Sequence, residues 1–175
     1  MKNGKIVVRK ASGRDGDSFI ALVRELADYE KLPPPGRREE ARLRRDAFGR
    51  KPRFELLMAF RGGKAVGYAA FFMTYSTFLA RPTLYLEDIY ISQESRRSGV
   101  GSAIFAKLAA TAVRRGCGRM EWSVLRWNRP AIAFYRGLGA RELKEWTYYR
   151  LTGDAIREIS GRKGGRRGKG AEGEI

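Results

Sequence analysis

The segment RRSGVGSAIFAKL, from Arg96 to Leu108, combines residue types that can bind phosphate. Gly99 and Gly101 have no Cβ, so their backbone can approach a ligand closely and adopt dihedral angles that other residues avoid. From Gly101 to Arg115, apolar residues recur at the four-residue spacing of a helix that packs on a core. Because the free N–H groups at the start of a helix form an anion site, the segment predicts a phosphate-bearing ligand.

The surroundings of this loop narrow the type of ligand. The buried-strand pattern TLYLEDIYIS (83–92) precedes it, Arg96 stands before the glycines in the spacing Arg-x-x-Gly-x-Gly, and WNRPAIAFYRGLGA (127–140) follows later in the chain. The loop lacks the Lys-Ser/Thr ending of a P-loop and the third glycine of a dinucleotide fingerprint. These differences argue against nucleotide hydrolysis and against hydride transfer.

Hydrophobic periodicity and turn residues predict the elements that position the loop. We expect helices at 13–31, 37–48, 101–115 and 128–139. We expect strands at 5–10, in a hairpin over 53–75 that turns at Gly62 and Gly63, at 83–92, at 119–125, and once or twice within 140–153. The order predicts one α/β domain over residues 1–159, followed by a disordered Gly-rich basic tail (160–175) with almost nothing apolar to bury.

The composition excludes several kinds of site. Among the 175 residues there is one cysteine, Cys117, and no histidine. A disulfide framework, a Cys/His zinc site and a His-based triad are therefore excluded, and we expect no metal. We expect a reducing, cytoplasmic setting, with neither a membrane span nor a signal peptide. The net charge of +17 invites a nucleic-acid interpretation, but for the tail we favour solubility or nonspecific contact with polyanions.

Two stretches, YLEDIYISQESRRSGVGSAIFAKL (85–108) and WNRPAIAFY (127–135), resemble the GNAT family of N-acetyltransferases. The resemblance covers the chain to about residue 159, and ELADYEKL (25–32), YST (75–77) and YLEDIY (85–90) are similar to the spermidine/spermine (diamine) and thialysine acetyltransferase group. It implies a single-domain fold whose central mixed, mostly antiparallel β-sheet is flanked by helices. It also implies acetyl-CoA as cosubstrate and a homodimer, to which EWTYYRLTG (145–153) could supply an edge strand.

The resemblance further implies how acetyl-CoA is held. The loop backbone would bind the pyrophosphate, Ile89 and Ile91 would pair with the pantetheine arm, and Asn128 would contact that arm from the other side. In full, the expected cofactor-binding residues are Ile89, Tyr90, Ile91, Arg96, Arg97, Ser98, Gly99, Val100, Gly101, Ser102, Asn128 and Tyr135.

Acetylation of an amine needs a proton acceptor and a proton donor. An alkyl amine with a pKa near that of lysine, about 10.4, is protonated at pH 7 and must lose a proton before it attacks a thioester. A nearby carboxylate can accept that proton directly or through water. Glu87 lies on the strand that leads into the loop, and the resemblance implies that it is the base and that Tyr135 is the general acid for the departing thiolate.

A cationic substrate near a protein of charge +17 requires local acidic groups, and the candidates are Glu30, Glu87 and Asp88. The resemblance implies a substrate contact for Glu30. The spermidine/spermine enzymes carry an aspartate at the position of Thr77, so this chain departs from them and agrees better with the thialysine branch. We expect a small primary amine, either a diamine or polyamine or a lysine-like or ornithine-like amino acid. The departure at Thr77 favours a short diamine or such an amino acid over a long polyamine.

Other functions stay open at this stage. The same cofactor site would support acetylation of protein N-termini or lysines, although YLEDIY argues against the N-terminal acetylators. A protein of another class, a basic nucleic-acid-associated binding protein with this fold, is also compatible with the charge. Cys117 lies in an expected turn between a helix and a strand, which favours direct transfer in a ternary complex over an acyl-cysteine intermediate.

Overall fold

The computed structural model describes residues 4–161. The chain divides into two compact units, Met1–Leu125 and Arg126–Ile175, and each is described by itself. The expected single domain over residues 1–159 therefore stays a prediction. The expected tail lies outside the described residues, except for Ser160 and Gly161, which belong to a helix.

The first unit is built on one five-stranded sheet in the order β1-β2-β3-β4-β5. Its strands are β1 (Ile6–Lys10), β2 (Glu55–Arg61), β3 (Lys64–Ser76), β4 (Arg81–Ile91) and β5 (Arg119–Trp122). Neighbouring strands from β1 to β4 are antiparallel, whereas β5 is parallel to β4. The hairpin between β2 and β3 turns at Gly62 and Gly63, whose φ angles of 56° and 82° suit the two-glycine turn that favours tight hairpins. The α/β class and the mixed, mostly antiparallel sheet are confirmed.

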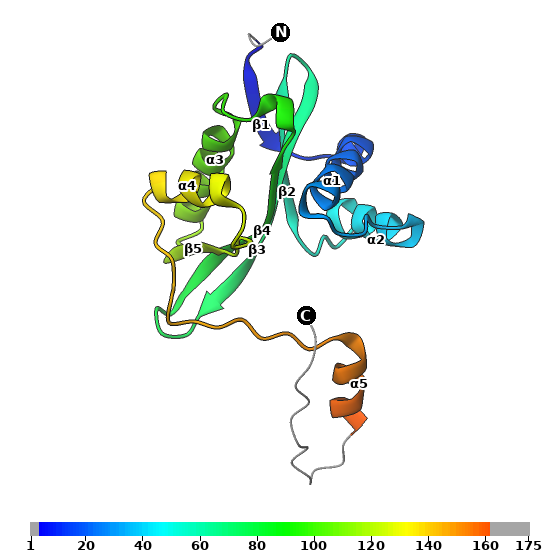
Figure 1. Cartoon of the computed structure of the whole chain (residues 1–175), viewed down its shortest axis with the longest axis vertical. Helices are drawn as coiled ribbons and strands as arrows, with labels where there is room; N and C mark the ends of the chain where they lie inside the picture. The colour runs from blue at the N-terminus through cyan, green and yellow to red at the C-terminus, as the bar shows by residue number, and fades with distance from the viewer. Residues whose placement is uncertain (1–3, 162–175) are drawn as a thin grey trace. The chain divides into compact units, whose positions relative to one another are not determined.

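Helices cover both faces of this sheet. Figure 1 shows α1 (Gly16–Glu30) and α2 (Arg37–Phe48) on one side and α3 (Val100–Arg114) on the other. Short 3-10 turns precede α1 (Gly13–Asp15) and follow β4 (Gln93–Ser95). Asp15, the residue before α1, accepts two hydrogen bonds from the Arg9 guanidinium, both 2.8 Å long, and one from the Ser12 backbone N–H. The helices expected at 13–31, 37–48 and 101–115 are thereby confirmed, with small changes at their ends.

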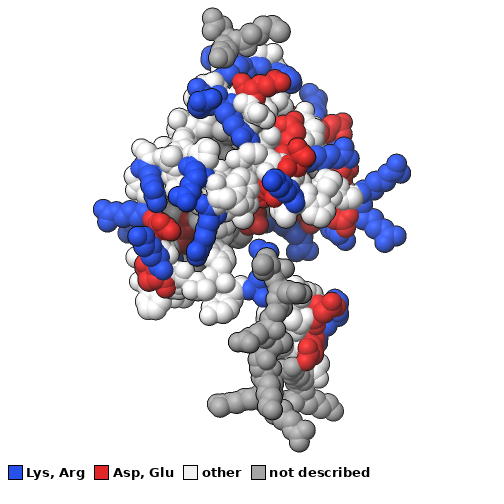
Figure 2. All heavy atoms as spheres, viewed as in Figure 1, with Lys and Arg blue, Asp and Glu red and all other residues white. Residues whose placement is uncertain are grey.

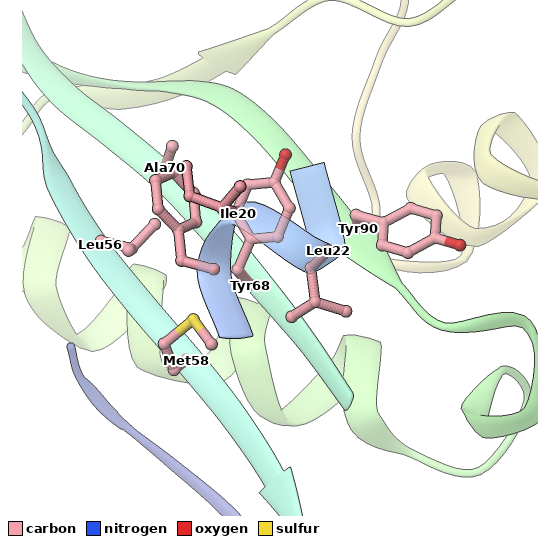
Figure 3. Close-up of a cluster of buried hydrophobic side chains, with 8 residues drawn as sticks. Ile20, Leu22, Leu56, Met58, Tyr68, Ala70 and Tyr90 are labelled. Atoms are coloured by element: carbon pink, nitrogen blue, oxygen red, sulfur yellow. The ribbon is translucent and has the colours of Figure 1, made fainter. Parts of the chain in front are cut away.

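The main core lies between α1 and the sheet. Its buried side chains come from α1, β2, β3 and β4 (Figure 3): Phe19, Ile20, Leu22, Leu56, Met58, Tyr68, Ala70 and Tyr90. On α3, the helical spacing noted in the sequence buries Ile104, Leu108 and Ala112. These two layers fix β4 and the loop that follows it.

The second unit contains α4 (Arg129–Gly137) and α5 (Gly153–Gly161). The expected strands within 140–153 are wrong, because residues 140–152 form no strand in the described structure. Their aromatic side chains are exposed, 71% for Trp146 and 92% for Tyr149. A strand requires hydrogen-bonding partners, and the described part of this unit contains none to pair with. The helix α5 does not correspond to any helix expected from the sequence.

Candidate active site

The expected phosphate loop lies between the end of β4 and the start of α3. Gly99 is the N-cap of α3 with φ of 88°, a left-handed conformation that favours glycine. The Ala103 N–H donates the first helical hydrogen bond to the Gly99 carbonyl at 3.0 Å. The N–H groups of Val100, Gly101 and Ser102 precede that bond, and Gly99 and Ser102 are exposed. This geometry fits the pyrophosphate of acetyl-CoA.

Arg61 at the end of β2 holds the loop in place. Its guanidinium Nη2 donates to the Ser98 carbonyl at 3.0 Å and to the Ser98 Oγ at 2.5 Å. The Ser98 Oγ itself donates to the Ser95 carbonyl at 2.5 Å. The Ser98 side chain therefore fixes the loop from within. Sequence reasoning missed Arg61, since nothing in the sequence links a hairpin residue to a loop so far along the chain.

Arg96 joins the loop to α1. Its guanidinium carbon lies 4.2 Å from the Tyr29 ring centre and 5.6 Å from the Tyr90 ring centre, and its Nε donates to the Ile91 carbonyl at 3.1 Å. A cation over an aromatic face is attracted by the ring quadrupole. Arg96 is thus committed to protein partners, whereas Arg97 is exposed. The cofactor contacts expected of both arginines stay predictions.

One edge of β4 is open beside this loop. The pairing of β4 with β5 ends at Leu86, opposite Trp122. On the other edge, the Ser92 N–H donates to the Val66 carbonyl, so Ser92 and Val66 form a hydrogen-bonded pair. Because such pairs alternate along an antiparallel ladder, the backbone groups of Ile89 and Ile91 point away from β3, toward the open edge. Because Arg96 already donates to the Ile91 carbonyl, the backbone groups of Ile89 and the N–H of Ile91 support the expected pairing with a pantetheine arm.

A β-bulge at Glu87 places two consecutive acidic residues together. Asp88 pairs with Ala70 while Leu86 pairs with Phe71, so Glu87 is an extra residue on β4. The bulge shifts the alternation of side chains by one residue. Asp88 consequently shares the α1 face of the sheet with Ala70 and Tyr90, and Glu87 is exposed beside it.

The electrostatics of this acidic cluster, Glu30, Glu87 and Asp88, are unusual in so basic a protein. Burial, and then the charges of Glu87 and Glu30, raise the pKa of Asp88 to about 6. Burial also raises the pKa of Glu30 at the end of α1. Across residues 4–161, no ion pair joins any of the three to a lysine or arginine. Since carboxylates that repel one another are stabilised by an added positive charge, the cluster is suited to bind a cation.

The lysine and arginine side chains, unlike the three acidic residues of the cluster, are not gathered at one place on the face seen in Figure 2. Figure 2 shows Lys and Arg side chains at several separate places on the viewed face, with Asp and Glu among them. On that face, therefore, no single basic patch accounts for the net charge of +17.

The remaining expected site residues lie in the second unit. Asn128 is the N-cap of α4, and its Oδ1 accepts a hydrogen bond from the Ala131 N–H at 3.3 Å, as its position before Pro130 predicts. Tyr135 lies on the same helix, with its ring 5.7 Å from that of Phe134. The first unit thus brings together the acidic cluster and the loop, while the roles of Asn128 and Tyr135 stay predictions.

Two further observations concern the described residues as a set. None of their helices is both long and apolar enough to cross a membrane. Within residues 4–161, no three Asp, Glu or Cys side chains are grouped so that they could hold a metal ion.

Comparisons with known proteins agree with this geometry. The model of the acetyltransferase (GNAT) family matches residues 21–140. Thialysine N-epsilon-acetyltransferase of Sus scrofa is 39% identical over 168 residues, which cover 90% of this chain and 98% of that protein. L-ornithine N5-acetyltransferase NATA1 of Arabidopsis thaliana is 45% identical over 93 residues, covering 53% of this chain and 41% of that protein.

Among solved structures, integron cassette protein VCH_CASS6 from the mobile metagenome of V. cholerae superposes with a TM-score of 0.80. It is 20% identical and covers 91% of this chain and 100% of that one, which shows a shared fold. The family match extends over most of the chain and includes the loop, the open edge of β4 and the acidic cluster. The chain therefore belongs to the GNAT acetyltransferase family, and it is an N-acetyltransferase that uses acetyl-CoA.

Proposed function

We propose that this enzyme acetylates a primary amine of a small molecule, either a short diamine or a lysine-like or ornithine-like amino acid. The observation that carries the proposal is the acidic cluster, which has no lysine or arginine ion-pair partner among residues 4–161 and adjoins the open edge of β4. Such a cluster favours a positively charged acceptor despite the net charge of +17. The names of the thialysine and ornithine relatives support the same substrate class.

The residues have separable roles in this proposal. Acetyl-CoA supplies the acetyl group as a thioester. The first N–H groups of α3 bind its pyrophosphate, and the outward backbone groups of Ile89 and Ile91 align its pantetheine arm. Asp88 and Glu30 attract the positively charged substrate, and Glu87, the most exposed of the three, accepts the proton that the reacting amine must lose. Tyr135 donates a proton to the departing thiolate.

We also propose direct attack on the thioester rather than transfer through a cysteine. Cys117 is partly buried, and its Sγ lies 3.8 Å from the Met73 Sδ, beyond the end of α3 and before β5. The glycine loop and the acidic cluster, in contrast, lie around the opposite end of α3 and the bulge of β4. A Cys117→Ala enzyme should therefore retain turnover, and loss of turnover would favour an acyl-cysteine route.

The test is thiol release from acetyl-CoA with thialysine, ornithine, lysine, putrescine, spermidine, spermine and a peptide with a free N-terminus. We expect release with a small amine and none with the peptide. Glu87→Gln should lower kcat about 100- to 10,000-fold, the range typical of a lost general base. Glu94→Gln, an exposed glutamate outside the acidic cluster, is the matched control. Release only with the peptide would refute the proposal and favour a protein acetyltransferase.

A homodimer is a further proposal for this chain. The segment EWTYYRLTG (145–153) contains no strand in the described structure and exposes the side chains of Trp146 and Tyr149. An exposed aromatic segment of this kind can pair with a second copy. Light scattering should give the mass of a dimer, and a monomer at working concentration would refute it. The cytoplasmic location also stays a prediction.

A further inference from the structure

The hydroxyl of Tyr68 is polar, deeply buried and has no protein partner. Tyr68 lies on β3 with 0% of its surface exposed, and its hydroxyl forms no hydrogen bond within the described structure. A buried polar group without a partner costs free energy, so such groups are rare in folded proteins. Figure 3 shows this ring inside the cluster beneath α1, with its hydroxyl pointing in a different direction from that of Tyr90. A phenylalanine would fill the same space without that cost.

The hydroxyl lies within the electrostatic influence of the acidic cluster. Tyr68 pairs across the strands with Tyr90, so Asp88, two residues before Tyr90, is its diagonal neighbour on the same face. Diagonal neighbours are within reach of an aromatic side chain. After burial, the charges of Asp88 and Glu30 are the next largest causes of the raised pKa of Tyr68. The hydroxyl therefore keeps its proton and can still accept a hydrogen bond through its oxygen.

These groups complement an alkylammonium ion. Such an ion has three N–H donors. Asp88 and Glu30 offer carboxylate oxygens from β4 and α1, and Tyr68 offers a hydroxyl oxygen from β3. Neither carboxylate has a lysine or arginine partner among residues 4–161, and the Tyr68 hydroxyl has no hydrogen-bond partner there. Both carboxylates are only partly buried and can be reached from solvent, whereas the Tyr68 hydroxyl is covered and can bind a ligand only after a side chain over it moves.

The sheet order indicates which nitrogen of the substrate this subsite takes. The pantetheine arm is proposed to lie along the open edge of β4, on the side away from β3. Tyr68 lies one strand further from that edge, a spacing of about 4.8 Å. Glu87, on β4 itself, is nearer to the edge where transfer would occur. A substrate that contacts both Glu87 and Tyr68 must therefore span two neighbouring strands, which two nitrogens joined by a short alkyl chain can do.

We propose that Tyr68, with Asp88 and Glu30, binds the second, non-reacting ammonium group of the substrate, and that Tyr68 thereby selects for substrates with two amino groups. This inference rests on the proposed small-amine activity and deepens it. In a diamine the second group is the distal amine, and in an ornithine-like substrate it is the α-amino group. A monoamine leaves the subsite empty and gains nothing from the hydroxyl.

The experiment compares 1,4-diaminobutane with butylamine in the wild type and in Tyr68→Phe. Tyr68→Phe removes a hydrogen bond to a charged group, so we expect kcat/KM for the diamine to fall about 10- to 100-fold in this variant. We expect kcat/KM for butylamine and KM for acetyl-CoA to be unchanged, and the melting temperature to stay equal or rise. Thr83→Val is the matched control. Thr83 lies on the same sheet and also has a buried hydroxyl with no hydrogen-bond partner in the described structure, so its replacement should leave kcat/KM for both amines unchanged.

Several results would overturn the inference. Equal losses with both amines would show that the hydroxyl acts on the reacting nitrogen or on the fold, and no loss with either would show that it has no role. If the wild type acetylates neither amine, the proposed activity fails for diamines. In that case, the inference is tested by calorimetric binding of 1,4-diaminobutane to the acetyl-CoA-loaded wild type and Tyr68→Phe. Equal binding to the two proteins, or no binding to the wild type, would refute the inference. Should Tyr68→Phe not fold, Asp88→Asn must show the same selective loss.

Discussion

Asp88 should make the enzyme less stable at neutral pH than at mildly acidic pH. Its pKa is about 6 in the folded protein, against 3.8 for the free group, because burial and two neighbouring carboxylates oppose its charge. A carboxyl group whose pKa is raised by folding binds its proton more tightly in the folded state. The stability that it contributes is therefore complete below about pH 4 and is lost as the pH rises through about 6.

Asp88→Asn removes this charge while keeping a similar shape. The rise in pKa corresponds to about 2 to 3 kcal/mol, and its partial exposure reduces the expected gain to about 2 kcal/mol at pH 7. Urea unfolding at pH 7 and at pH 4.5 measures it. The variant should be the more stable protein at pH 7, and the difference should shrink at pH 4.5.

The control is Asp28→Asn, which removes a charge from an exposed position on α1. It should change stability little at either pH. If Asp88→Asn is destabilised at pH 7, or if its advantage over the wild type does not depend on pH, then Asp88 is compensated in solution by a cation and the argument from repulsion is wrong. The stabilised variant should also bind the amine more weakly, since the same charge serves the ligand.

Three further predictions follow from other contacts. Asp15→Asn should destabilise the fold by about 2 kcal/mol, measured by urea unfolding at pH 7, because Arg9 then loses the carboxylate with which it forms an ion pair at the start of α1. Arg61→Met should raise KM for acetyl-CoA about tenfold, measured by steady-state kinetics, because the Ser98 loop loses the bonds that hold it; an unchanged KM would contradict this. Tyr135→Phe should lower kcat about 100-fold without weakening acetyl-CoA binding, measured by turnover and calorimetry, and equal turnover would remove the proposed proton donor.

Local signals made much of the fold predictable. The helix Arg37–Phe48 agrees with its expected bounds because prolines precede it and Gly49 follows it. The hairpin was predictable because Gly62 and Gly63 supply the positive φ angles of its turn. Both features depend on residues close together in the chain.

The errors arose where a partner element decides the structure. The aromatic residues and Thr147 within 140–153 favour a strand only if another strand is available to pair with the segment. The bulge at Glu87 depends on how β4 aligns with β3, which no residue of β4 specifies alone. Tyr68 looked like one more apolar strand residue, because its significance lies in the charges that the fold brings near it.

The bulge at Glu87 also determines, for each later residue of β4, which face its side chain is on and toward which edge its backbone groups point. A one-residue change of register would turn the backbone groups of Ile89 and Ile91 inward to β3 and move Asp88 to the opposite face. The acidic cluster and the open edge are therefore set by the same extra residue. Insertions or deletions between Leu86 and Ile89 should abolish acetyl-CoA alignment and amine binding together, so the length of this short segment is as essential to the enzyme as the identity of its side chains.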